Sequence, residues 1–213
     1  MRMISAVLLL GLVTGCGVAA ADVPPVSAQA RAAGFVDVRS AVPDAIIDLR
    51  YATANNFTGV QLYPSDARCL VHESLAPGLT AAAGALRARG RRLVFWDCYR
   101  PHDVQVRMFQ VVPNPNWVAR PGPLARSHET GRSVDVTTAD QQGRLAEMGT
   151  GFDDFTPTAT AYADGISARA TAERAALREA MGAGGLSVYS GEWWHFDGPG
   201  AGVGRPILDV PVT

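Results

Sequence analysis

The sequence predicts a single α+β domain in which helices flank a small, mostly antiparallel sheet. About 190 residues remain once an apolar leader is set aside, and that length suits one compact domain with a sizeable core. Strand-like and helix-like stretches are interspersed without the regular strand–helix–strand alternation of a parallel sheet. No internal repeat divides the chain into smaller units.

The N-terminal residues have the pattern of a secretory signal. Residues 1–3 form a short basic start, residues 4–13 are almost entirely apolar, and small residues are common from 14 to 21. The apolar run is too short to cross a bilayer, so residues 1–21 are predicted to be a signal peptide. No other stretch of the sequence is long and apolar enough to span a membrane.

Two routes of processing remain open for this signal. Val13-Thr14-Gly15 before Cys16 resembles a bacterial lipoprotein signal, in which Cys16 is lipidated and becomes the mature N-terminus. Ordinary cleavage after Ala19-Ala20-Ala21 is the alternative. Both routes predict an exported protein of the periplasm or cell envelope, and only the first anchors it to a membrane.

The first half of the chain contains a predicted tether, two strands and a helix. Residues 22–34 begin with a Pro-, Ala- and Ser-rich stretch and are expected to tether the domain at 35–213. The apolar run at 45–51 predicts a strand. Residues 72–89 are rich in Ala and Leu and predict a helix that ends before Gly90, and 92–96 predict the next strand.

The second half contains two predicted helices and three predicted strands. A short helix is expected at 102–111, because prolines at 113 and 115 prevent its continuation. Residues 133–138 read as a strand that carries Asp135 inward, and 168–181 as a helix stopped by glycines. Short strands around 186–189 and 192–196 complete the domain.

Composition and charge exclude several classes of function. A net charge of −1 provides no basic surface for nucleic acid. All 19 basic residues are arginine, so lysine-based Schiff-base, Walker-type and Ser-Lys chemistry are excluded. No Gly-x-Ser-x-Gly motif is present, which makes Ser127 beside His128 a poor candidate for a serine hydrolase.

Two imidazoles and a carboxylate have the makings of a catalytic metal site at the sheet. His128 and Asp135 lie seven residues apart, and Gly131 between them permits a tight turn. His195 is expected to come from a distant strand. This set suits zinc, and also iron(II). Glu192 stands three residues before His195 and can accept a proton from water, which favours a zinc hydrolase.

Five sequence blocks carry a family resemblance. They are SHETGRSVD at 127–135, EWWH at 192–195, WDCYRP at 96–101, DLRYATANNFTG at 48–59 and MGTGFD at 148–153. In this order they resemble the VanX-type D-alanyl-D-alanine dipeptidases of the zinc DD-peptidase group, over roughly residues 35 to 213. The first block is shared with carboxypeptidases of that wider group, whereas the last two and Tyr-Arg-Pro are typical of the dipeptidases.

The resemblance implies a role for each residue of the reaction centre. His128, Asp135 and His195 become the ligands of one zinc ion per chain. Glu192 becomes the general base that deprotonates water and returns the proton to the leaving amine. Arg100 steadies the oxyanion of the tetrahedral intermediate, a role that suits a permanently charged group with fixed donors.

The resemblance also implies how the substrate is held. Asp153 and Tyr51 are expected to accept the substrate ammonium, and Ser127 is expected to contact the substrate. The chain departs from the pattern at Arg126, where these dipeptidases often have a serine that contacts substrate. This departure leaves the details of substrate recognition open, whereas the metal chemistry is unaffected.

The cysteines that remain after export, Cys69 and Cys98, are expected to form a disulfide. A helix antiparallel to the following strand would bring them to the same end of the domain. Two buried free thiols are the alternative.

The function implied is hydrolysis of D-alanyl-D-alanine to two D-alanines, in peptidoglycan turnover, D-alanine recovery or glycopeptide resistance. Two alternatives remain: a zinc DD-carboxypeptidase that acts on peptidoglycan stem peptides, and a non-catalytic peptidoglycan-binding module whose zinc is structural. Glu192 argues against the second, because a structural site has no use for an unligated carboxylate.

Overall fold

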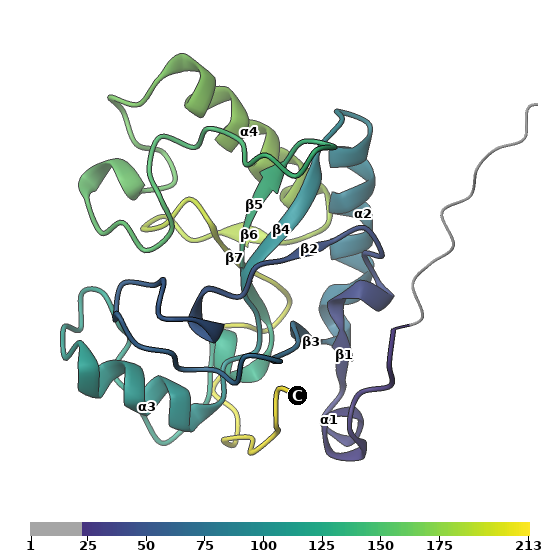
Figure 1. The fold of residues 1–213 in the computed structure, drawn as a ribbon, viewed down its shortest axis with the longest axis vertical. Coiled ribbons are helices and arrows are strands. Elements are labelled where there is room, and N and C mark those ends of the chain that lie inside the picture. The colour runs from purple at the N-terminus through teal and green to yellow at the C-terminus, as the bar shows by residue number, and fades with distance from the viewer. Residues whose placement is uncertain (1–22) are drawn as a thin grey trace, which may run out of the picture.

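The computed structural model describes residues 23–213, and Figure 1 shows its ribbon. Strands and helices are interspersed along the chain, in agreement with the sequence prediction. Their order is α1 (Ala28–Ala32), β1 (Phe35–Asp37), β2 (Ile46–Ile47), β3 (Leu70–His72), α2 (Ala76–Arg87), β4 (Arg92–Asp97), α3 (His102–Val111), β5 (Ser133–Ala139), α4 (Ala168–Ala183), β6 (Ser187–Val188) and β7 (His195–Asp197).

The main sheet has five strands in the order β2-β4-β5-β7-β6. Only β2 and β4 are parallel, and the other three pairings are antiparallel. Strands β1 and β3 form a separate antiparallel pair. The predicted α+β fold with a mostly antiparallel sheet is therefore confirmed.

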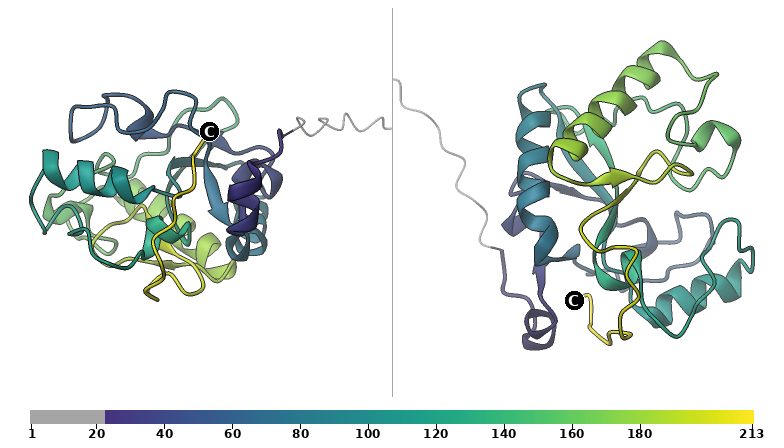
Figure 2. Two further views of the ribbon diagram at one scale, coloured as in Figure 1. Left: turned by 90° about the horizontal axis from the view of Figure 1, so that it is seen from below. Right: turned by 180° about the vertical axis from the view of Figure 1, so that it is seen from behind.

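The core lies between the central strands and two helices. All seven residues of β5 are buried, and so are the last five of β4. Helices α2 and α4 contact each other, and Figure 2 shows them side by side. Their close approach requires glycine: a Cβ on Gly78 would lie 2.2 Å from the carbonyl oxygen of Gly184. Figure 1 shows α3 and long connecting segments across the strands from α2.

The bounds of three predicted elements differ from the structure in ways that affect the site or the core, while the other elements differ by at most two residues. The strand expected at 45–51 is reduced to β2, and a 3-10 turn, Arg50–Ala52, follows it. The helix expected at 72–89 is α2, which begins at Ala76 with a proline in its first turn, because His72 ends strand β3 and Glu73–Leu75 form a 3-10 turn. The strand expected at 192–196 is β7, so Glu192 lies in the preceding turn.

The stretch predicted as a tether is partly folded onto the domain. Helix α1 lies within it, and the Ala30 side chain is buried. Arg68 donates hydrogen bonds to the carbonyl oxygens of Pro24 and Pro25, and its Nε donates to Asp37 at 2.9 Å. These contacts cross the boundary expected at residue 35.

The signal peptide predicted at residues 1–21, with Cys16, lies outside the described residues and stays a prediction. Among residues 23–213, no helix has the length and apolar character needed to cross a membrane.

Candidate metal centre and active site

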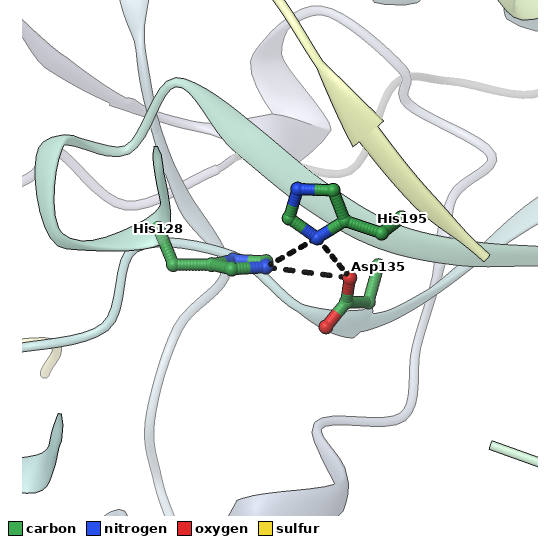
Figure 3. A group of neighbouring side chains, drawn as sticks. All are labelled: His128, Asp135 and His195. Atoms are coloured by element: carbon green, nitrogen blue, oxygen red, sulfur yellow. Dashed lines mark hydrogen bonds and ion pairs between the residues drawn. The ribbon is translucent and has the colours of Figure 1, made fainter. Parts of the chain in front are cut away.

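Three side chains from separate parts of the chain converge at one end of the central strands, as Figure 3 shows. Asp135 on β5 and His195 on β7 are directly opposite each other in the antiparallel register, and His195 Nδ1 lies 3.0 Å from Asp135 Oδ1. His128 Nε2 approaches from the preceding turn, 3.3 Å from the same oxygen and 3.1 Å from His195 Nδ1. The sheet register therefore assembles a compact cluster of potential metal ligands.

A 3-10 turn, Ser127–Thr130, directs His128 toward the strands. It ends at Gly131, whose φ of +62° is in the left-handed region that favours glycine. Any side chain at this position would collide with the core, since a Cβ would lie 2.3 Å from Phe35 Cε1. The short spacing between His128 and Asp135 thus depends on a glycine, as the sequence suggested.

Hydrogen bonds on the outer side of each imidazole orient the ring. His128 Nδ1 lies 2.8 Å from the carbonyl oxygen of Cys98, an acceptor that fixes the proton on Nδ1 and leaves Nε2 with its lone pair. His195 Nε2 lies 3.1 Å from Asp197 Oδ1, which favours a free lone pair on Nδ1. Both free nitrogens face Asp135. Two imidazole nitrogens and a carboxylate oxygen arranged in this way fit a zinc ion, as they would iron(II).

The charges of Asp135 and the two histidines stabilise one another. Burial by itself would raise the pKa of Asp135, but the two histidines outweigh burial and hold it well below its usual range. Burial likewise opposes charge on His195, but hydrogen bonds to Asp135 and Asp197 raise its pKa to about 10. A bound divalent cation would take the place of this proton.

A cavity of about 670 Å³ opens beside the cluster. It is lined by all three candidate ligands and by every other residue predicted to act on the substrate, namely Tyr51, Arg100, Ser127, Asp153 and Glu192. The structure therefore brings together residues from five separate blocks of the sequence.

Glu192 is placed in this cavity by the turn before β7, where its backbone N–H donates to the carbonyl oxygen of Tyr189 at 3.2 Å. Burial raises the pKa of its carboxyl group, and the nearby Asp135 carboxylate raises it further. No ion pair to Glu192 is present within the described part of the chain. A carboxylate with a raised pKa and no cationic partner is suited to accept and release a proton.

Arg100 is held rigidly at the cavity wall. Its Nε and Nη2 donate to Asp97 Oδ2 at 3.0 and 2.7 Å, and its Nη1 donates to Gln105 Oε1 at 2.7 Å. The guanidinium also lies over the Tyr51 ring, 5.3 Å from the centroid. The remaining N–H donors of the guanidinium are thereby fixed in direction.

Tyr51 and Asp153 form a hydrogen-bonded pair, with 2.9 Å between Tyr51 Oη and Asp153 Oδ2. Burial, followed by repulsion from Asp135, raises the pKa of Asp153 well above its usual value. Asp153 has a φ of +55° and Ser127 a φ of +50°, the only non-glycine residues in the described chain with positive φ. Both line the cavity, and backbone strain of this kind gathers at functional sites.

Ser127 and the cysteines lie close to the cluster. Ser127 Oγ donates to Ser133 Oγ at 2.9 Å and lies 3.4 Å from His195 Nε2. A disulfide joins Cys69 to Cys98, with 5.3 Å between their Cα atoms. Since Cys98 supplies the carbonyl oxygen for His128, the disulfide supports the strand end beside the cluster.

Asp97 and Gln105 are the functional neighbours that sequence reasoning missed. The Asp97 side chain is fully buried, and it accepts hydrogen bonds from Arg100, from Tyr63 Oη at 2.5 Å and from the Cys98 N–H at 2.9 Å. The position of Asp97 three residues before Arg100, at the end of an apolar strand, is the sequence feature that indicates its role as a partner of this arginine.

Comparison with known proteins gives consistent matches over most of the chain. The profile of the Peptidase_M15 family, D-ala-D-ala dipeptidase, matches residues 31–213. A D-alanyl-D-alanine dipeptidase of Escherichia coli (strain K12) is 35% identical over 174 residues, 82% of this chain and 89% of the relative. One of Enterococcus faecium is 30% identical over 188 residues, 76% of this chain and 90% of the relative.

Solved structures are more distant. The LD-carboxypeptidase LdcB is similar with a TM-score of 0.43 and 18% identity, over 62% of this chain and 60% of that one. A likeness this weak does not bear on function.

Proposed function

The chain belongs to the D-Ala-D-Ala dipeptidase family of M15 peptidases, and from this premise we propose that it is a zinc metallopeptidase that hydrolyses D-alanyl-D-alanine to two D-alanines. One observation carries the proposal. A single cavity contains the His128, Asp135 and His195 cluster, the unpaired Glu192 and the Tyr51–Asp153 pair. These are the groups needed to bind a metal, activate water and hold a free amino terminus.

One zinc ion is proposed to bind His128 Nε2, Asp135 and His195 Nδ1. When bound, zinc supplies Lewis-acid chemistry that lowers the pKa of water and polarises a carbonyl group. The outer hydrogen bonds of both histidines to Cys98 and Asp197 keep the rings in position for such an ion. Asp135 supplies the negative charge that the two neutral imidazoles lack.

Glu192 is proposed to move the proton. Its carboxylate takes a proton from the attacking water as the water oxygen bonds to the peptide carbonyl carbon. It then gives that proton to the peptide nitrogen as the C–N bond breaks. The raised pKa of Glu192 suits both steps, because a base with a pKa closer to neutral both accepts and releases a proton readily.

Arg100 is proposed to bind the oxygen that becomes negative when water adds to the carbonyl carbon. The contacts to Asp97 and Gln105 fix the guanidinium before substrate arrives, so little reorganisation is needed as charge develops. These contacts use three of its five N–H donors, which leaves two for the oxyanion.

The Tyr51–Asp153 pair is proposed to accept the substrate ammonium. Asp153 is partly buried, and its carboxylate has the Tyr51 hydroxyl as a donor but no cation paired with it among the described residues. A substrate ammonium would supply that positive charge. A peptide that is extended at its amino terminus has no such charge. This contact therefore favours a free dipeptide over a longer stem and disfavours the DD-carboxypeptidase alternative.

The protein is also proposed to be exported, on the basis of the apolar leader at residues 1–21. Mass spectrometry of the mature N-terminus tests the route. A lipidated Cys16 would mean an anchored protein, whereas a free Asp22 would mean a soluble periplasmic or extracellular one. A mature protein that retains Met1 would contradict export by either route.

Release of D-alanine from three substrates tests the function directly. Purified protein with zinc is incubated with D-Ala-D-Ala, N-acetyl-D-Ala-D-Ala and a pentapeptide stem. We expect rapid release from the first and far lower kcat/KM for the other two. Comparable kcat/KM for all three would favour a carboxypeptidase, and no release from any would favour a binding module.

A further inference from the structure

A buried arginine outside the cavity has no acidic partner. Arg174 on α4 is 1% exposed, and no carboxylate in residues 23–213 forms an ion pair with it. Its Nε donates to the Met148 carbonyl oxygen at 2.6 Å, and its Nη1 and Nη2 donate to those of Thr160 and Thr158, each at 3.0 Å. Burying a charge is unfavourable unless such contacts compensate it, so the guanidinium depends on this set of acceptors.

All of these acceptors belong to one segment, residues 148–160, called here the 148–160 loop. Arg174 binds the carbonyl at its start and two carbonyls at its end, and Nη2 lies 3.4 Å from the Thr150 hydroxyl. The planar fork of a guanidinium can hold several acceptors at fixed angles, which a single ammonium cannot. The two ends of the loop are therefore joined through one side chain.

The same side chain connects the loop to the segment that carries Glu192. The Arg174 guanidinium lies over the Trp193 ring, 5.3 Å from its centroid. Trp193 Nε1 donates to Thr150 Oγ1 at 2.8 Å, and its backbone N–H donates to the Ala159 carbonyl oxygen at 3.0 Å. Trp193 follows Glu192, whose own backbone N–H is held separately by the Tyr189 carbonyl oxygen, so Trp193 mainly fastens the loop to the turn before β7.

Asp153 lies in the middle of the 148–160 loop, in a left-handed conformation with φ of +55°. A non-glycine residue persists in that region only when its surroundings hold it there. The loop contains just one 3-10 turn, at Pro157–Ala159, and so has little regular backbone structure of its own. Phe152, next to Asp153, packs against Trp96 and Trp194. The contacts from Arg174 and Trp193 hold the two ends of the loop, on either side of Asp153.

We propose that Arg174 is a positioning residue for substrate recognition: it holds the 148–160 loop so that Asp153 meets the substrate ammonium. This inference rests on the proposed dipeptidase function. Arg174 does not line the cavity, so it acts on the substrate only through Asp153. Its loss is expected to weaken ammonium binding more than it slows the chemical step.

Three variants test the proposal. Arg174→Gln removes the fork, and Thr150→Val removes only the hydroxyl that Arg174 and Trp193 share. Arg178→Gln is the matched control, because Arg178 lies one turn further along α4 and donates to the carbonyl oxygen of Ala161, beyond the loop. Each variant is checked for folding by circular dichroism, and kcat and KM are then measured with D-Ala-D-Ala and N-acetyl-D-Ala-D-Ala.

We expect Arg174→Gln to raise KM for D-Ala-D-Ala by about tenfold, the size of one charge-assisted hydrogen bond. Its kcat should stay within about threefold of wild type, and the preference for the free over the acetylated dipeptide should fall as KM rises. Thr150→Val should raise KM by roughly threefold, and Arg178→Gln should leave KM unchanged. If Arg174 were needed only for folding stability, Arg174→Gln would lower the melting temperature but would not raise KM while leaving kcat nearly unchanged.

If Arg174→Gln and Thr150→Val both fold and keep the wild-type KM and substrate preference, the proposal is overturned. A decrease in kcat of Arg174→Gln without a rise in KM would also overturn it. If Arg174→Gln does not fold, Thr150→Val decides: a raised KM supports the proposal and an unchanged one overturns it. A wild-type protein that releases no D-alanine would instead refute the proposed function and with it this inference. If the wild-type protein is active and the variants have the same KM and substrate preference, only the proposed role of Arg174 is refuted.

Discussion

Replacing Arg100 with alanine is expected to remove a catalytic donor and to leave a buried carboxylate without its cation. The Asp97 side chain is fully buried, and Arg100 supplies two of its hydrogen bonds. After the substitution Asp97 keeps only the Tyr63 hydroxyl and the Cys98 N–H as donors. The variant therefore has two separable defects, one in turnover and one in stability.

Typical magnitudes can be given for both defects. Loss of one donor to an oxyanion costs about 2.7–4 kcal/mol, or roughly 10²–10³ in kcat. Removing one partner of a buried ion pair costs about 3–5 kcal/mol of folding free energy, because the remaining charge is uncompensated. The KM for D-Ala-D-Ala should change less than kcat, since the oxyanion charge appears only along the reaction path.

A double variant separates the two effects. Arg100→Ala with Asp97→Asn removes the unpaired charge, so urea unfolding should show most of the lost stability restored while kcat stays low. Steady-state kinetics on both variants completes the comparison. Near-normal kcat in folded Arg100→Ala would refute the oxyanion role, and a change confined to KM would make Arg100 a clamp for the bound substrate.

Three further outcomes are expected. Glu192→Gln should retain its metal, measured by mass spectrometry, and its kcat should fall by about 10²–10⁴-fold. Near-normal kcat would show that another group is the general base. Burial opposes charge on Asp37, but its two arginine partners outweigh burial and lower its pKa below 3.8. The contribution of Asp37 to the unfolding free energy is thus complete above pH ~4 and lost as pH falls through the lowered pKa. Urea unfolding should therefore show that the unfolding free energy falls more steeply with decreasing pH in wild type than in Asp37→Asn. The same pH dependence in both proteins would contradict this expectation. Reducing the Cys69–Cys98 disulfide should lower the unfolding free energy by roughly 3.5 kcal/mol, and two reactive thiols in denatured, unreduced protein would exclude the bond.

The sequence predicts the metal site well because two of its three candidate ligands, His128 and Asp135, are close together in the chain. His128 and Asp135 are joined by a turn whose geometry depends on Gly131, and the glycine is visible in the sequence. His195 is different, since its place beside Asp135 comes from the register of β5 and β7, sixty residues apart. The histidine was identified from its motif, whereas only folding shows why it faces Asp135.

Support around the site is less visible in the sequence. Tyr51 was expected on a strand, but only Ile46 and Ile47 pair with β4, and a 3-10 turn places Tyr51 at the cavity. Asp97 and Arg174 look like ordinary charged residues until the structure shows that both are buried. The carbonyl oxygens that hold Arg174 and the Tyr63 hydroxyl that binds Asp97 are distant in sequence, and residue type or periodicity does not reveal such contacts.

Zinc-dependent release of D-alanine is the most direct test of the metal-centred dipeptidase activity. Protein is freed of metal by chelation, its metal content is verified, and zinc is added back while D-Ala-D-Ala hydrolysis is measured on the same sample. We expect no hydrolysis without metal and a rise in hydrolysis with added zinc that ends at one ion per chain, held by His128, Asp135 and His195. Full hydrolysis by protein verified to contain no metal would contradict it.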